Sequence, residues 1–334
     1  MNKILFALIT SVFSMQVSNA EQITLRIHHF LSSKAPLHSA FLVPFAEELE
    51  EKSNGRLNVE IFDSMSLGGR PNDVYDQVAD GAIDIGLVVP GYTPGLFNDT
   101  EVFELPFVMK DPIATTKAFS DLVETNLKDT EYADAKILAS WVHGPGVIHS
   151  ETPINSLDDL AGVELRGPTR LVTQTIAELG AIPVGMPLPS VPESLSKGVI
   201  SGTLLPWEVT PAIRLSELVS NHTEFASEES LYTTAFVLAM NLEIFEALPF
   251  DLQQIIENSS GKELSVNAVS AMLAADSYGK EIANSLGNNI IVLSNQEVNR
   301  WKLAARPIID KWIATDESRQ NLLNDVQILI ELYN

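Results

Sequence analysis

The sequence contains no cysteine among its 334 residues. This absence excludes disulfides, thiolate zinc sites and thiol nucleophiles. It also removes the residue that a lipoprotein anchor requires, so we expect the mature protein to be free rather than tethered. Two domains of ordinary size can be stable without disulfides, because each can bury its own hydrophobic core.

Long apolar runs and positive charge are also scarce. No run of roughly 18 apolar residues occurs, which predicts no membrane-spanning segment and no direct membrane insertion. The chain has 21 Lys and Arg against 44 Asp and Glu, a net charge of −23. Nucleic acid is therefore excluded as a partner, since binding it needs a positive surface. An anionic ligand would require a basic residue placed specifically for it.

The first twenty residues differ from the rest of the chain. Lys3 is followed by an apolar run over residues 4–12, and the small residues Ser18 and Ala20 precede polar Glu21. This pattern is typical of a secretory signal peptide cleaved after Ala20. A short buried helix is the alternative, which the extreme N-terminal position disfavours. The pattern predicts a periplasmic protein.

The next segment reads as alternating strands and helices. Strands are predicted over 21–30, 57–61 and 82–89, and helices over 37–53 and 73–80. Such a run favours a parallel or mixed sheet covered by helices, that is, an α/β fold. Ligands in these folds bind at the carboxyl ends of strands. This rule makes His29, Phe30 and Tyr92 candidate binding residues.

A related pattern recurs further along the chain and indicates a second lobe. Strands are predicted over 136–141, 163–166, 181–186 and 235–240, and helices over 169–179, 191–197, 297–313 and the tail. One helical stretch, 249–286, interrupted only softly at Gly261 and Gly279, is long enough to cross both lobes. We expect lobe I over 21–142 and 232–272, lobe II over 143–231 and 273–315, and a C-terminal helical tail over 316–334.

Motifs for catalysis and for metal binding are missing. The chain lacks Gly-x-Ser-x-Gly, His-Glu-x-x-His and a phosphate-binding loop, so we expect no enzyme and no cofactor. No histidine pair has the spacing of a helical metal site, and we expect no metal. His28 and His29 are adjacent on a strand and point to opposite faces, so at most one reaches a cleft. His143 is a further hydrogen-bonding candidate.

Seven motifs carry a resemblance to a known family. They are spread in order along the mature chain: Glu51–Leu57, Leu67–Gly69, Gly81–Gly86, Leu105–Phe107, Asp159–Arg166, Leu179–Pro187 and Lys197–Gly202. In their order and spacing they resemble the DctP-like family, the periplasmic solute-binding proteins of tripartite ATP-independent periplasmic (TRAP) transporters. The resemblance covers essentially the whole mature chain.

This resemblance implies a fold, an activity and partners. The fold is a two-lobed, type II-like periplasmic binding protein that closes over a small carboxylate without covalent chemistry. The partners are the small and large permease components of a TRAP transporter. Presentation of the ligand to an ABC transporter or a sensor is the alternative, and an exported hydrolase is a further one.

The resemblance also implies that Arg166 pairs with the ligand carboxylate. A guanidinium offers two parallel hydrogen bonds to a carboxylate and keeps its charge when it is desolvated. A structural salt bridge is the alternative role. Arg170 follows four residues later and either reaches the same site or caps the lobe surface.

Departures from the family pattern indicate an apolar pocket. Leu205 stands where many members have a polar Asn, and Leu188 where many have Phe. Trp207 and Phe30 could pack on the body of the ligand, although Trp207 could instead fill the core. Glu208 could bind a hydroxyl or an amine. We therefore expect a monocarboxylate with a hydrophobic or aromatic body.

Overall fold

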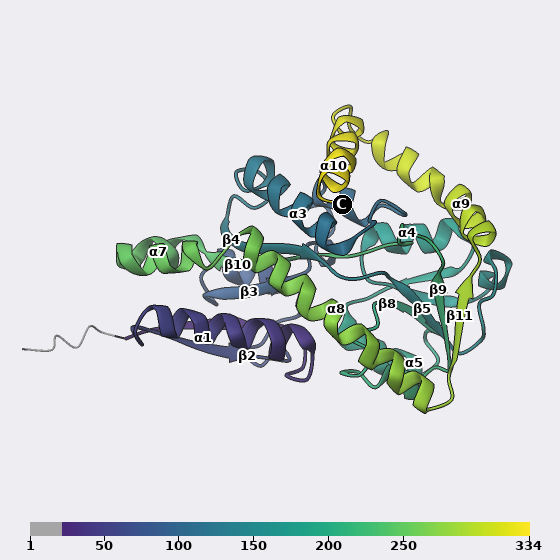
Figure 1. The fold of residues 1–334 in the computed structure, drawn as a ribbon, viewed down its shortest axis with the longest axis horizontal. Coiled ribbons are helices and arrows are strands. Elements are labelled where there is room, and N and C mark those ends of the chain that lie inside the picture. Colours follow the sequence, from purple (N-terminus) through teal and green to yellow (C-terminus); the bar gives the residue numbers. More distant parts are fainter. Residues whose placement is uncertain (1–21) are drawn as a thin grey trace, which may run out of the picture.

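The structure, a computed structural model, describes residues 22–334. The predicted signal peptide lies outside the described residues. Within residues 22–334, no helix is both long enough and apolar enough to cross a membrane. The described chain forms two β-sheets covered by helices, which confirms the predicted two-lobed α/β fold (Figure 1). We call the parts built around the first and the second sheet the first and the second lobe.

The first sheet has the strand order β2-β1-β3-β10-β4. Its strands are β1 (Ile23–His28), β2 (Leu57–Phe62), β3 (Ile85–Val88), β4 (Ala135–Val142) and β10 (Ala235–Asn241). β1 pairs in parallel with β2 and β3, whereas β10 runs antiparallel between β3 and β4. The helices of this lobe are α1 (Val43–Lys52), α2 (Val74–Ala79), α3 (Pro112–Leu122), α6 (Leu242–Ala247) and α7 (Phe250–Asn258).

The second sheet has the strand order β11-β9-β5-β8-β6-β7. Its strands are β5 (Val147–Ser150), β6 (Glu164–Gly167), β7 (Ile182–Gly185), β8 (Gly202–Leu205), β9 (Asn221–Phe225) and β11 (Asn289–Leu293). Its helices include α4 (Arg170–Glu178), α5 (Val191–Ser196) and α9 (Asn295–Ile313). Because β6 and β8 are parallel neighbours, their carboxyl ends open at the same sheet edge.

The long helix between the lobes is shorter than the sequence predicts. The predicted stretch 249–286 is divided at Gly261, whose φ of +86° favours glycine, and α8 begins at Lys262. α8 (Lys262–Ser285) has 24 residues and spans about 36 Å. It contacts β4 of the first sheet and β11 of the second, and Figure 1 shows it running along both. The helix therefore connects the two lobes, as predicted.

The C-terminal helix α10 (Arg319–Tyr333) packs on α3 of the first lobe. Its buried side chains Leu323, Val326 and Ile330 join a core cluster that includes Phe119 and Val237. The chain thus returns from the second lobe to the first at its end. The α9–α10 segment links the lobes at a second place, apart from α8.

Candidate functional site

A small cavity of about 40 Å³ lies between the two lobes. The first lobe contributes residues that follow β1 and β3 and residues at the start of β10. The second lobe contributes the carboxyl ends of β6 and β8, and α8 adds one side chain. The lining residues are Phe30, Leu31, Leu37, Val89, Tyr92, His143, Arg166, Pro168, Leu188, Leu205, Pro206, Glu208, Val209, Tyr232, Thr234, Phe236 and Met272.

Arg166 supplies the positive charge of the cavity. It is completely buried at the end of β6, and its Nε and Nη1 donate to the carbonyls of Met186 and Leu204 at 2.8 and 3.0 Å. Its Nη2 has no hydrogen-bond partner. Within residues 22–334, no carboxylate forms a salt bridge with it, and burial lowers its pKa. The guanidinium is thus held in place by carbonyls and lacks a counter-ion.

Two further polar groups in the cavity wall lack partners. The hydroxyls of Tyr232 and Thr234 are buried, and neither forms a hydrogen bond within residues 22–334. Both residues line the cavity together with Arg166. Buried polar groups are almost always hydrogen-bonded. Three unpaired donors around one cavity therefore fit an acceptor-rich group such as a carboxylate.

Aromatic and aliphatic side chains form most of the remaining wall. The rings of Phe30 and Tyr92 are in tilted contact, with centroids 5.6 Å apart. Phe236 is stacked on Trp141 at 5.6 Å, which fixes the orientation of its ring. Leu188 and Leu205 complete the apolar surface from the second lobe. Such walls suit a flat apolar body attached to the charged group.

His143 and Glu208 also line the cavity, and both are buried. The Nδ1 of His143 lies 2.5 Å from the carbonyl of Gly144, and burial lowers its pKa to about 4. Burial, followed by the nearby Asp276 carboxylate, raises the pKa of Glu208 well above its usual range. His143 is therefore neutral near pH 7, burial favours the protonated form of Glu208, and Arg166 is the one lysine or arginine among the lining residues.

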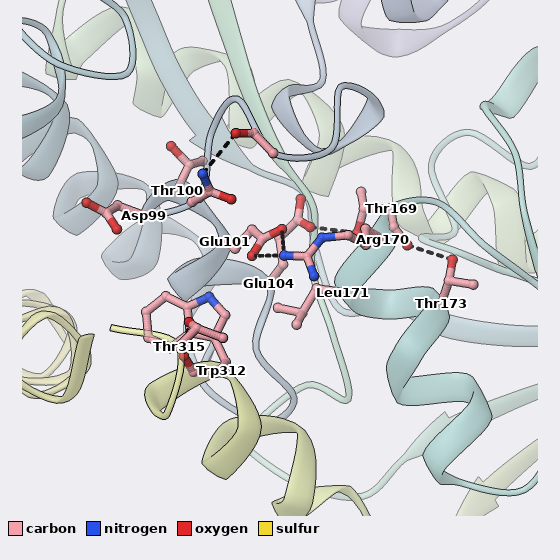
Figure 2. Close-up of polar contacts among 12 residues, drawn as sticks. Asp99, Thr100, Glu101, Glu104, Thr169, Arg170, Leu171, Thr173, Trp312 and Thr315 are labelled. Atoms are coloured by element: carbon pink, nitrogen blue, oxygen red, sulfur yellow. Dashed lines mark hydrogen bonds and ion pairs between the residues drawn. The ribbon is translucent and has the colours of Figure 1, made fainter. Parts of the chain in front are cut away.

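Arg170 does not line this cavity, contrary to one of its two predicted roles. It lies at the start of α4, and its Nη2 is 2.6 Å from both carboxylate oxygens of Glu101 (Figure 2). Glu101 belongs to the first lobe, in the short helix η4 (Thr100–Glu104). The side chain of Arg170 therefore reaches across the gap between the lobes. This ion pair joins the two lobes.

A second contact between the lobes lies beside the first. The hydroxyl of Thr169 donates to Oε2 of Glu104 at 2.6 Å (Figure 2). The amide of Ala235 donates to Oε1 of the same carboxyl group. Burial raises the pKa of Glu104 to about 8. A Cβ at Gly91 would overlap the side chain of Thr169, so the close approach of the lobes requires glycine there. The structure is thus a closed arrangement of the lobes.

Trp207 lies outside the cavity, and its predicted placement is corrected. Its neighbours Pro206 and Glu208 line the cavity, whereas Trp207 is buried on the opposite side of the chain. Its ring packs on His149 and His222, and its Nε1 donates to Glu224 at 2.6 Å. Trp207 is thus a core residue of the second lobe, which was the alternative role considered for it.

His29 also lies outside the cavity wall. It is completely buried, and its Nε2 is 2.9 Å from Nδ1 of His38. Burial and the neighbouring His38 lower its pKa to about 4. His28 contacts the carbonyl of Gly68 instead. Within residues 22–334, no group of three or more His, Asp or Glu side chains is arranged to hold a metal ion.

Sequence reasoning missed the contribution of the β10 region and α8. Tyr232, Thr234, Phe236 and Met272 line the cavity but were not predicted. The run Tyr232-Thr233-Thr234 places hydroxyls directly before an apolar strand, which is a signal that could have indicated them. Met272 carries no such signal, because it is one of several apolar residues along α8.

Comparisons with known proteins identify related chains. The family described as bacterial extracellular solute-binding protein, family 7 (DctP), matches residues 27–316. A curated relative, the C4-dicarboxylate-binding periplasmic protein DctP of Rhodobacter capsulatus, is 24% identical over 72% of this chain and 71% of its own length. The sequence resemblance to TRAP solute-binding proteins is thereby confirmed.

Solved structures extend this comparison. A TRAP solute-binding protein from Rhodoferax ferrireducens in complex with copurified benzoate has a TM-score of 0.91 and 39% identity, covering 93% of this chain and 98% of its own. A marine metagenome TRAP solute-binding protein specific for aromatic acids, in complex with 3-hydroxybenzoate, has a TM-score of 0.91 and 37% identity, covering 94% and 99%. This chain therefore belongs to the DctP family of extracellular solute-binding proteins, the ligand receptors of TRAP transporters.

Proposed function

We propose that this protein is the periplasmic receptor for an aryl monocarboxylate. The single observation that carries the proposal is the buried guanidinium of Arg166, which has a free Nη2 and no carboxylate partner within residues 22–334. A ligand carboxylate would neutralise this charge and accept hydrogen bonds from Nη2 and from the hydroxyls of Tyr232 and Thr234. Because Arg166 is the one cationic side chain in the cavity wall, the ligand should carry one carboxylate rather than two.

The apolar wall supports an aromatic body for this ligand. Phe30, Leu188, Leu205 and Phe236 offer few partners to sugar hydroxyls, whose burial without hydrogen bonds is unfavourable. Two relatives more than 35% identical were solved with benzoate and with 3-hydroxybenzoate. The same class of ligand therefore suits this chain.

The proposed mechanism is closure of the two lobes on the ligand. Arg166 extends from the second lobe, while Phe30 and Tyr92 come from the first, so one ligand contacts both. The amide of Leu188 donates to the Tyr92 hydroxyl at 3.1 Å across the same gap. A ligand that contacts both lobes stabilises the closed state by its differential affinity. The signal peptide would direct the protein to the periplasm. There the closed, ligand-bound form would deliver the acid to the TRAP permease in the membrane.

A thermal-shift panel tests this function. The mature protein, from residue 21, is heated with benzoate, mandelate, succinate, D-glucuronate and ectoine. We expect benzoate or mandelate to raise the melting temperature, and the other three to raise it little or not at all. Stabilisation by D-glucuronate or succinate without an effect of either aryl acid would contradict the proposal.

A further inference from the structure

Glu208 is a buried carboxyl group in the cavity wall. The carboxylate proposed for the ligand gives it no role there. Glu208 follows β8 in the second lobe, is only 5% exposed and belongs to the cavity wall. Within residues 22–334, its carboxyl group forms no hydrogen bond and no salt bridge. Its chain neighbours Leu205, Pro206 and Val209 offer it no side-chain donor, and the hydroxyl of Tyr232, which lies near enough to feel its charge, forms no hydrogen bond with it.

The surroundings of Glu208 oppose its ionisation. Its own backbone amide donates to Oδ1 of Asp276 at 3.0 Å, which brings a second carboxyl group from α8 close to it. The nearest lysine on that helix, Lys280, pairs with Glu224 instead. Burial and Asp276 both favour the protonated form of Glu208. A protonated carboxyl group offers one donor and one acceptor.

A group of the ligand that both donates and accepts a hydrogen bond would pair with this carboxyl group. We propose that Glu208 binds a hydroxyl substituent on the aromatic ring, so that the preferred ligand is a hydroxyaryl monocarboxylate. A phenolic hydroxyl also offers one donor and one acceptor, and it would satisfy both needs of the neutral carboxyl group. An ammonium substituent would instead need the ionised form, which Asp276 disfavours. This inference rests on the proposed function and narrows its class of ligands.

Calorimetric titration of benzoate and of 2-, 3- and 4-hydroxybenzoate tests the inference. With the wild-type protein, we expect at least one hydroxybenzoate to bind about tenfold more tightly than benzoate, because a buried polar group left unpaired is unfavourable. The Glu208→Gln variant keeps a neutral donor and acceptor and should retain this preference. The Glu208→Met variant should lose the preference while still binding benzoate.

A matched control separates this effect from a general change of the surface. Glu217 lies in the same lobe, is half-exposed and pairs with Arg214, so Glu217→Met should leave the preference unchanged. The inference fails if benzoate binds the wild-type protein as tightly as every hydroxybenzoate, or if the preference survives in Glu208→Met. It also fails if the wild-type protein binds 4-(aminomethyl)benzoate tightly and Glu208→Gln abolishes this binding, because that result would identify an ionised Glu208. Absence of binding by all four acids would instead refute the proposed function.

Discussion

Replacing Arg166 by methionine should separate ligand binding from folding. Methionine keeps much of the length of the side chain but removes the charge and all five donors. A ligand carboxylate in the mutant cavity would be buried without its counter-ion. Breaking a buried ion pair from one side costs about 3–5 kcal/mol, which corresponds to roughly a 100- to 4,000-fold weaker affinity.

The effect of Arg166→Met on stability without ligand should be small. The substitution removes two hydrogen bonds, to the carbonyls of Met186 and Leu204, each worth about 1 kcal/mol. It also removes a buried charge that has no counter-ion within residues 22–334, which is favourable. These terms oppose each other, so we expect the free energy of unfolding to change by less than about 2 kcal/mol.

Two assays check this prediction. Calorimetry with benzoate gives the dissociation constant, and urea denaturation without ligand gives the free energy of unfolding. Arg306→Met is a matched control, because Arg306 is exposed on α9 and pairs with Asp310. It should change neither quantity appreciably. Wild-type affinity of Arg166→Met for benzoate, with the control behaving as expected, would refute the assignment of Arg166.

Three further predictions concern residues outside the cavity. Arg170→Ala should weaken the binding of every acid by a similar factor of about 2–5, because the partly exposed ion pair of Arg170 with Glu101 stabilises the closed state and does not contact the ligand. Calorimetry with two aryl acids checks this, and weaker binding of only one of the two acids would contradict it. Glu104→Gln should flatten the pH dependence of stability. The pKa of Glu104 is about 8 when folded and 4.5 ordinarily, so the contribution of Glu104 to stability is fully present below pH 4.5 and is lost as the pH rises to about 8. Unfolding of both proteins at pH 5 and pH 8 measures this contribution, and an equal pH dependence of the two would refute it. Trp207→Phe should lower the free energy of unfolding by about 1–3 kcal/mol, because packing and the hydrogen bond to Glu224 are lost. Its affinity for the aryl acids, measured by calorimetry, should change by less than about twofold. A change in ligand preference would instead place Trp207 at the binding site.

Periodicity and family motifs were sufficient to predict the fold. The alternation of strands and helices located most elements of both lobes, because each pattern reflects burial against a sheet. Arg166, Leu188 and Leu205 were predicted on the cavity wall and lie there. These residues sit at strand ends or directly after them, where the fold class itself determines the position of the ligand.

Side-chain direction outside regular strands could not be predicted. Pro206 and Glu208 line the cavity while Trp207 between them faces the core, and no periodicity in that loop shows this beforehand. Arg170 pairs with Glu101, which lies 69 positions away in the chain and in the other lobe, and no spacing in the sequence indicates this partner. Thr234 and Met272 reach the site through long-range packing of β10 and α8, which one sequence does not specify.

The most direct measurement is a crystal structure of the mature protein with bound benzoate. We predict that the carboxylate lies between the lobes, with one oxygen about 2.7–2.9 Å from Nη2 of Arg166. The ring should lie among Phe30, Leu188 and Phe236. A benzoate whose carboxylate points away from Arg166, or one bound outside this cavity, would contradict the assignment of both the site and the class of ligand.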